Sequence, residues 1–333
     1  MLAVLPAASS GAVEANGHRR SSPTVVVANR GSGDISVIDT RTHSVDNVDL
    51  PGEAEPMYVS HDPRQDRVFV GDRAASQMIV LDDDTFEVVD SVDVGDGVFH
   101  QWLDPVRRQL WVVGDSSQTV TVVDTRTLEV RTTIAMPADV ADSGGKPHDV
   151  FVSGRFAYVT ILGFDDDNND ETPTVGQVIQ YSTRDFAEVS RTTVGDDPHV
   201  FVRQGVLYVA SQDSSEVATF NARTMRLLRT TTVSAAHGIF VTGGGEVLVT
   251  SIADGGTNAV SELNRRITRV VDTVDTSVPV PHNLTVDGRR QMYVTHSGPT
   301  ADQVSIVPLR RNGFGDPVTV TVGTNPFGLA FVR

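Results

Sequence analysis

The chain has 333 residues, of which 39% are hydrophobic, and a formal net charge of −16 at pH 7. This acidity argues against a nucleic-acid partner, because phosphate binding requires a basic face. The absence of cysteine excludes disulfides, thiolate metal ligands and cysteine nucleophiles. No apolar run approaches the roughly 18 residues that a membrane span needs, so the sequence predicts a soluble globular protein.

Residues 1–22 are expected to lie outside the fold, as a tail or the remnant of an export signal. They begin with the apolar and small residues M-L-A-V-L-P-A-A-S-S-G-A, which are typical of the end of a secretory signal, but they lack a basic opening segment. We therefore expect an extracytoplasmic or secreted protein, with a cytoplasmic location as the alternative.

From Thr24 onward the chain repeats one unit. Each unit contains an apolar run followed by a polar hairpin and another apolar run. The first of these two runs reads, in chain order, V-V-V-A-N, V-F-V-G-D, L-W-V-V-G, A-Y-V-T-I, L-Y-V-A-S, V-L-V-T-S and M-Y-V-T-H. β-Branched runs bounded by turns predict strands, and the lack of a 3.6-residue stripe predicts very little helix.

The turn that follows the second of these two runs also repeats. It reads D-T-R-T at Asp39 and Asp124, and N-A-R-T at Asn221. Asp and Asn favour such a position because their side chains bond the backbone two residues further on.

A further apolar run opens each unit, and one position within it, which we call the slot, can be aligned from unit to unit. Successive slots lie 38 to 51 residues apart, which is the range of a four-stranded propeller blade. The segment from Thr24 lacks this run, whereas the C-terminal F-G-L-A-F-V-R is such a run with nothing after it. Joined, the two ends complete one blade and remove the free sheet edges. We therefore predict an all-β, seven-bladed β-propeller of four-stranded blades, closed by N- and C-terminal strands and formed by one domain over residues 23–333.

The runs A-Y-V-T-I, V-L-V-T-S and M-Y-V-T-H resemble those of YVTN-repeat β-propellers. The resemblance covers residues 23–333 and implies the fold more than the function, because a propeller hosts many unrelated activities. The wider superfamily includes surface-layer propellers, lactonase-like proteins and the propeller domain of nitrous oxide reductase.

Histidine fills the repeated slot in five consecutive units. In a propeller this slot lies where the innermost strand begins, at the mouth of the central channel. Imidazole is the commonest biological metal ligand, and five imidazoles without a metal or acid partner would be costly to protonate in a narrow channel. The sequence therefore predicts a metal site whose ligands are all five or a subset of three or four: His100, His148, His199, His237 and His282.

An all-imidazole set suits copper, iron, zinc or nickel, and disfavours calcium and magnesium. We favour copper. Met57 in the same slot is expected to be an apolar residue of the rim, with a soft copper ligand as the alternative. Phe327 fills the seventh slot and is expected to leave an opening for substrate. Two residues beyond the slot, an apolar layer is expected under the histidines: Val59, Trp102, Val150, Phe201, Ile239, Leu284 and Leu329.

The resemblance supplies precedents for a histidine metal centre on a propeller axis. Nitrous oxide reductase holds a histidine-ligated copper cluster there, and carotenoid cleavage oxygenases hold a four-histidine iron centre. This chain lacks the cupredoxin domain of the first and the helical lid of the second, so neither activity transfers.

The leading hypothesis is a metal-dependent oxidoreductase that acts on a small molecule at the channel mouth, with His296 beside His282 as the proton-transfer residue. We expect a monomer. One alternative is a binding or scaffold propeller with structural histidines, marked by imidazoles bonded to backbone. Another is a lactonase or lyase that uses the histidines as acid and base.

Three histidines and one loop fall outside this scheme. His18, His43 and His61 are placed in the tail, in a turn and at the far end of an innermost strand. The acidic segment F-D-D-D-N-N-D-E-T at 164–172 lacks the turn glycine of a calcium loop. We favour a solvated lid, with calcium binding as the alternative.

Overall fold

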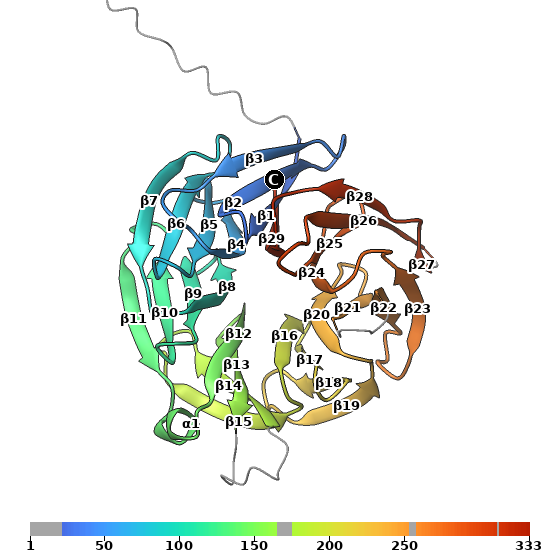
Figure 1. The fold of residues 1–333 in the computed structure, drawn as a ribbon. Coiled ribbons are helices and arrows are strands. Elements are labelled where there is room, and N and C mark those ends of the chain that lie inside the picture. The colour runs from blue at the N-terminus through green and yellow to red at the C-terminus, as the bar shows by residue number, and fades with distance from the viewer. Residues whose placement is uncertain (1–21, 165–174, 253–257, 312) are drawn as a thin grey trace, which may run out of the picture.

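A computed structural model describes residues 22–164, 175–252, 258–311 and 313–333. Seven antiparallel sheets stand around a central axis like the blades of a propeller (Figure 1). Within those ranges the one helix is α1 (Ala138–Asp142), and no helix is long and apolar enough to cross a bilayer. The predicted seven-bladed, nearly helix-free fold is confirmed. The acidic segment beyond Phe164 lies outside the described residues.

The innermost strands of blades 1 to 7 carry the residues of interest, and the second strands run back beside them. The innermost strands are β29 (Pro326–Val332), β4 (Pro56–Asp62), β8 (Val98–Asp104), β12 (Lys146–Ser153), β16 (Pro198–Arg203), β20 (Ala236–Val241) and β24 (Pro281–Val286). The second strands are β1 (Thr24–Asn29), β5 (Arg67–Asp72), β9 (Gln109–Gly114), β13 (Phe156–Phe164), β17 (Val206–Ser211), β21 (Val247–Ser251) and β25 (Gln291–His296).

The third and outermost strands complete the blades. The third strands are β2 (Asp34–Asp39), β6 (Gln77–Asp82), β10 (Thr119–Asp124), β14 (Val175–Ser182), β18 (Glu216–Asn221), β22 (Ala259–Leu263) and β26 (Gln303–Arg310). The outermost strands are β3 (Val45–Asp49), β7 (Val88–Asp93), β11 (Val130–Ala135), β15 (Glu188–Val194), β19 (Leu227–Thr232), β23 (Val270–Asp275) and β28 (Val318–Thr321), and β27 (Gly313–Phe314) adds a short pairing to β26.

Blade 1 joins the two ends of the described chain. β29 pairs antiparallel with β1, with Thr24 opposite Val332 and Val27 opposite Leu329. The closure predicted from the incomplete first and last repeats is therefore confirmed. The C-terminal strand thereby becomes the innermost strand of blade 1 and lies against β4 and β24, the innermost strands of the two neighbouring blades.

The burial of each strand follows its distance from the axis. All six residues of β1 are buried, because both faces of a second strand pack against neighbouring blades. β7, an outermost strand, exposes all but one of its residues. The continuous apolar runs of the sequence are thus the strands that are covered on both faces.

The repeated turn between third and outermost strands has the predicted mechanism. Asp39 Oδ1 accepts the backbone N–H groups of Arg41 and Thr42 at 2.8 and 2.7 Å. His43 ends the turn in the left-handed region, at φ 58°, and its N–H bonds the carbonyl of Asp39 at 2.9 Å. Asp82, Asp124 and Asn221 accept the same pair of bonds in their own blades.

Candidate functional site

A register shift near the start of several innermost strands affects which side chains reach the axis, although β16, which carries His199, pairs without one. In β12 the shift falls between Pro147 and Val150, and β4, β8, β20 and β24 carry a shift at the equivalent place. Such a bulge breaks the alternation of a strand and re-aims its side chains. Consecutive residues, here His148 and Asp149, can therefore both face the axis.

The threonine of the Y-V-T and L-V-T runs bonds the residue that follows the histidine. Its Oγ1 accepts the backbone N–H of Asp149 and Gly238 at 2.8 Å and that of Asn283 at 3.1 Å. Two of these hydroxyls also donate to a backbone carbonyl of the next blade, at 2.6 and 2.7 Å. The three residues are Thr160, Thr250 and Thr295. They tie the start of each innermost strand to its own blade, and two of them to its neighbour.

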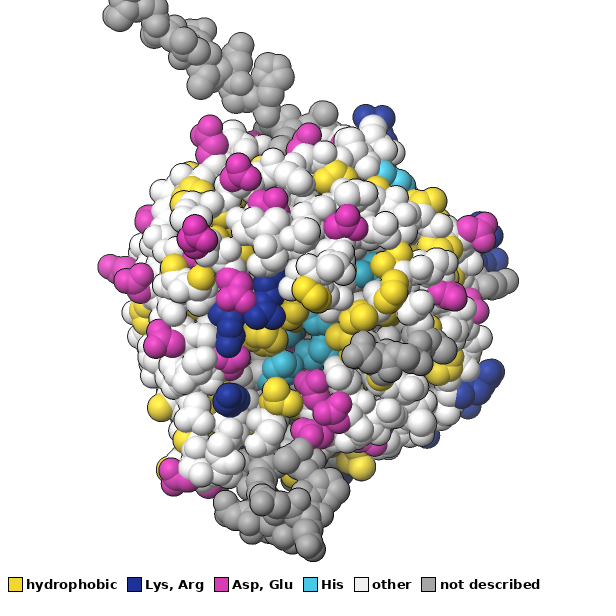
Figure 2. Space-filling view, viewed as in Figure 1, with side chains coloured by type: hydrophobic (Ala, Val, Ile, Leu, Met, Phe, Trp, Pro, Cys, Tyr) yellow, Lys and Arg dark blue, Asp and Glu magenta, His cyan; other side chains and the backbone are white. Residues whose placement is uncertain are grey.

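The five slot histidines converge at one level of the axis, and we call them the hub histidines: His100, His148, His199, His237 and His282. All five are only 2–8% exposed. Figure 2 shows histidine side chains at the bottom of a hollow near the axis. Ring centroids lie 4.7 Å apart for His148 and His199, and 3.8 Å apart for His199 and His237. The predicted gathering of imidazoles therefore includes every slot histidine.

Several ring nitrogens of this cluster face one another, and three have no hydrogen-bond partner among the described residues. Nε2 of His148 lies 3.2 Å from Nε2 of His199, and His100 offers a third nitrogen within 4.8 Å of both. Nε2 of His100 and both nitrogens of His237 are buried and have no hydrogen-bond partner among the described residues. Buried polar atoms are rarely left unpaired, and a shared metal ion is one way to satisfy such a group of nitrogens.

Burial keeps three of these rings neutral. It lowers the pKa of His100 to about 4, against the opposing effect of the Asp149 carboxylate. Burial also lowers the pKa of His237 and of His282 well below the usual value. Neutral imidazole is the form that binds metal ions, so these rings are ready to do so at pH 7.

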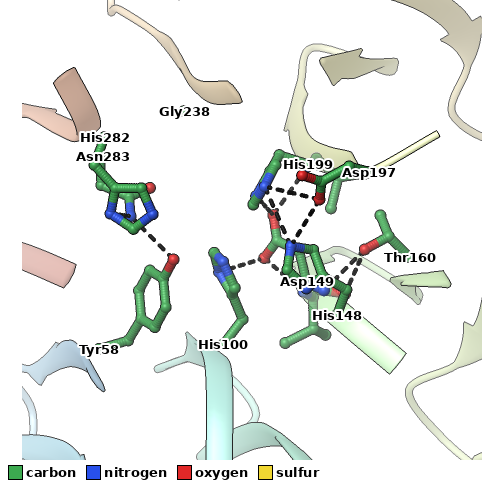
Figure 3. Close-up of polar contacts among 12 residues, drawn as sticks. Tyr58, His100, His148, Asp149, Thr160, Asp197, His199, Gly238, His282 and Asn283 are labelled. Atoms are coloured by element: carbon green, nitrogen blue, oxygen red, sulfur yellow. Dashed lines mark hydrogen bonds and ion pairs between the residues drawn. The ribbon is translucent and has the colours of Figure 1, made fainter. Parts of the chain in front are cut away.

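Asp149 bridges three blades. Its Oδ1 lies 2.9 Å from Nδ1 of His100 in blade 3, and its Oδ2 accepts the N–H of Val200 in blade 5 at 2.9 Å (Figure 3). Burial alone would raise the pKa of Asp149, but the adjoining His100 and His199 hold it well below its usual range. The carboxylate fixes the His100 proton on Nδ1, which leaves the Nε2 lone pair pointing into the cluster.

Asp197 is a second carboxylate at the cluster. Its Oδ1 lies 3.2 Å from Nε2 of His148 and 3.7 Å from Nε2 of His199. Burial raises the pKa of Asp197, but the hydrogen bond from His148 and the charge interactions with His199, His148 and His100 together outweigh burial and bring the pKa to about 2. This carboxylate, His199 and His237 also lie close enough together to share an ion.

On the opposite side of the cluster, a tyrosine and an asparagine replace the carboxylates. The Tyr58 ring lies on His100, with centroids 3.7 Å apart. Asn283 Nδ2 donates to Tyr58 Oη at 3.0 Å and lies 3.0 Å from Nδ1 of His282 (Figure 3). His282 thus has a polar partner, as His100, His148 and His199 do, whereas both ring nitrogens of His237 are unpaired among the described residues.

Sequence reasoning did not assign a role to Asp149, Asp197, Tyr58 or Asn283. The sequence feature that could have identified them is their position, because each lies within two residues of a slot residue. A regular strand would have turned a neighbour of the slot residue away from the axis.

The space beside the seventh slot residue, Phe327, is filled rather than open. The Phe327 ring lies 4.2 Å from His282, 5.5 Å from Tyr58 and 5.9 Å from Phe99. The expectation that this seventh slot leaves an opening for substrate is therefore wrong, because neighbouring aromatic rings close the space. Met57 is fully buried in the same group, packed with Tyr58 and Phe327.

A cavity of about 470 Å³ lies beneath the cluster along the axis, and we call it the axial channel. Its inner end is formed by Tyr58, His100, Asp149, His199 and Asn283. Six of the seven residues expected to form an apolar layer line its wall, namely Val59, Trp102, Phe201, Ile239, Leu284 and Leu329. Val150 instead packs inside its blade.

The other histidines are explained by local contacts. Both ring nitrogens of His296 have partners in its own blade, the carbonyl of Pro279 at 2.9 Å and Oγ of Ser305 at 2.8 Å. The role in proton transfer expected for His296 stays a prediction. His61 lies 2.8 Å from Asp83 at the far end of β4, and His43 lies in a turn, as expected.

The site and the fold together define a seven-bladed propeller with a buried histidine–carboxylate cluster at its hub. No family model and no curated protein matches the sequence. Among solved structures, the periplasmic gluconolactonase of Pseudomonas aeruginosa is similar, with a TM-score of 0.72 and 19% identity over 93% of this chain and 99% of that one.

Other similar structures belong to differently named proteins. A putative 6-phosphogluconolactonase from Bacteroides fragilis has a TM-score of 0.72 and 13% identity, over 94% of this chain and 99% of that one. Hydrazine synthase from Kuenenia stuttgartiensis has a TM-score of 0.65 and 15% identity, over 86% of this chain and 96% of that one. At such identities the likeness shows the propeller fold, as the YVTN resemblance implied, and leaves the activity to be argued from the site.

Proposed function

We propose that the chain is a hydrolase of small cyclic esters, a lactonase, whose hub histidines hold a transition-metal ion. The observation that carries the metal site is the approach of ring nitrogens of His100, His148 and His199 to within 4.8 Å of one another, with Nε2 of His100 buried and unpaired among the described residues. The fold likeness to two gluconolactonase-type propellers supports lactone hydrolysis. The copper redox chemistry expected from the sequence is supported only by the imidazole ligands, so we favour hydrolysis over it.

The metal ligands would be Nε2 of His100 and Nε2 of His199, with His148 and His237 as further imidazoles. Nε2 of His148 would first give up its hydrogen bond to Asp197. When bound, the ion would polarise a carbonyl oxygen and lower the pKa of a bound water. Copper, iron, zinc and nickel all suit imidazole ligands. Because hydrolysis requires no change of oxidation state, zinc serves it as well as copper.

The surrounding residues would divide the remaining work. Asp149 holds the His100 ring in one tautomer and orientation. Asp197, ionised beside His148 and His199, is placed to take a proton from the attacking water. The Tyr58 hydroxyl accepts from Asn283 and can donate its own proton to the substrate. Water adds to the carbonyl carbon, the ring C–O bond breaks, the leaving oxygen is protonated, and the product is a hydroxy acid.

The scaffold alternative fits the contacts less well. Structural histidines were expected to bond backbone groups. Of the hub histidines, His282 bonds the backbone of Phe327, whereas His100, His148 and His199 contact one another, Asp149 and Asp197. An ordinary structural role would not leave both nitrogens of His237 buried and unpaired.

A metal-free acid–base reaction is the competing catalytic explanation. The His100–Asp149 pair favours it, because a carboxylate that orients an imidazole is a general feature of acid–base sites. The two explanations differ in their response to chelation, since only the metal-dependent reaction requires an ion.

The test measures hydrolysis of a panel of γ- and δ-lactones, monitored through the release of acid, before and after dialysis of the protein against a chelator. We expect activity to fall at least tenfold on chelation and to return with zinc or copper. Activity that survives chelation would assign the reaction to acid–base chemistry, and no hydrolysis of any lactone would overturn the lactonase proposal. His43→Ala, at a histidine outside the hub, is the control for His148→Ala.

A location outside the cytoplasm is also part of this proposal. The absence of cysteine is compatible with it, and one of the similar structures is a periplasmic enzyme. Fractionation of the native host would test it.

A further inference from the structure

We propose that the substrate carries an apolar chain and that this chain lies in the axial channel while the ester lies at the hub. The inference rests on the proposed function for the reacting group, but the chain-binding site follows from the channel itself. Nothing in the metal site requires such a channel, so the two can be tested apart.

The size of the channel suits a ligand. Its volume of about 470 Å³ falls within the roughly 300–1,000 Å³ of small-molecule sites. It extends from the hub histidines to the far ends of the innermost strands, where Leu103, Phe240, Val286 and Phe331 also line it. These four residues are partly exposed, so the outer end of the channel is open to solvent.

The chemistry of the channel changes along its length. The inner end presents the Tyr58 hydroxyl, the His100 and His199 rings and the Asp149 carboxylate. The wall beyond it is apolar and partly aromatic, with Trp102 at 6.1 Å and Phe240 at 5.2 Å from the Phe201 ring, measured between centroids. A ligand that matches both parts has one polar, reactive end and one apolar tail.

A polyhydroxylated lactone fits this wall poorly. Among the described residues the wall offers few polar side chains, namely Ser60, His61, Gln101 and Thr285. His61 already lies 2.8 Å from Asp83, and the Gln101 amide already donates to the carbonyl of Phe69 at 2.9 Å. Several sugar hydroxyls placed there would lose water and find few partners, of which the unpaired Oε1 of Gln101 is one, and this loss is costly. An alkyl tail loses no hydrogen bond on entering and gains from leaving water.

The test separates binding from turnover. Two series with tails from methyl to nonyl are compared, δ-lactones as substrates and 2-alkyl tetrahydropyrans as unreactive ligands. We expect kcat/KM for the lactones to rise about threefold to fourfold per added methylene until the channel is filled. The tetrahydropyrans should bind with the same trend and quench Trp102, since the other tryptophan, Trp111, is fully buried in its blade.

Two variants narrow the channel at different depths. Leu329→Trp and Val286→Trp should each lower the ratio of long-tail to short-tail kcat/KM at least tenfold. The second variant guards against misfolding of the first, and circular dichroism and metal content are compared for both. Val189→Trp, at a 51% exposed position of β15, is the matched control and should leave the ratio unchanged.

The outcomes distinguish the two proposals. Chain-length-dependent binding of tetrahydropyrans without lactone hydrolysis would support the channel and overturn the lactonase. Lactone hydrolysis that is independent of tail length, and unaffected by Leu329→Trp and Val286→Trp, would overturn the channel and leave the lactonase. No binding of any tail would overturn the channel proposal whatever the activity.

Discussion

Oδ1 of Asp149 lies 2.9 Å from Nδ1 of His100, although the two residues belong to neighbouring blades. The contact makes the orientation of one hub imidazole depend on the next blade along the ring. Through Val200, the same carboxylate reaches a third blade. The geometry of the cluster is therefore a property of the closed ring.

Asp149→Asn should weaken metal binding about 10- to 100-fold. The amide keeps the size of the side chain but removes its charge, and it places an N–H₂ group against either the His100 N–H or the Val200 N–H. Competition with a chelator of known affinity measures the change. Asp83→Asn breaks a similar histidine–carboxylate pair, at His61, away from the hub. Equal affinities for Asp149→Asn and wild type would refute this role.

Tyr58→Phe should lower kcat for lactone hydrolysis about 10- to 100-fold while metal content stays at the wild-type level. The ring contact with His100 survives the change, but the hydroxyl that faces the reacting end of the channel is lost. Tyr208→Phe, on a partly exposed tyrosine of β17, serves as the control. An unchanged kcat for Tyr58→Phe would remove the tyrosine from the reaction.

Most of the fold could be predicted from periodicity, because each blade repeats the same strands and turns. The closure by β29 followed from the missing first run before Thr24. The histidine slot was also visible, since proline or a small residue marks the start of most innermost strands. These features are local or repeated, and so a single sequence reveals them.

The partners of the histidines could not be predicted in the same way. Alternation in a strand places Asp149 on the opposite side from His148, and the bulge that overrides alternation has no clear marker in the sequence. The partners of His296, and the packing of Phe327 against Tyr58 and Phe99, likewise depend on contacts between segments far apart in the chain.

Thr250→Val should lower the free energy of unfolding by about 1–3 kcal/mol, because a buried hydroxyl with two backbone partners is replaced by a methyl group. Urea unfolding followed by circular dichroism measures this. Thr321→Val, at an exposed position of β28, should change stability far less. Similar losses for the two variants would show that the threonine of the repeated run does not stabilise the bulge.

His296→Gln tests the structural explanation of His296 through pH. Burial lowers its folded-state pKa from 6.5 to about 4. Its contribution to stability is therefore fully present above pH 6.5 and is lost as pH falls towards 4, because the unfolded chain then binds a proton that the folded chain does not. The variant should lose less stability than wild type across this window, by on the order of 2 kcal/mol.

Metal content and lactone turnover should be unchanged in His296→Gln if the residue acts only through Ser305 and Pro279. A fall in kcat with a shifted pH–rate profile would instead support the proton-transfer role expected from the sequence.

The most direct test of the central claim is the metal stoichiometry of untagged protein, measured by mass spectrometry after extensive dialysis. It is compared between wild type and the His148→Ala, His199→Ala double variant, with circular dichroism to confirm that both are folded. The account predicts about one transition-metal ion per wild-type chain and almost none in the double variant. Folded wild-type protein that takes up no such ion, even when zinc and copper are supplied, would contradict it.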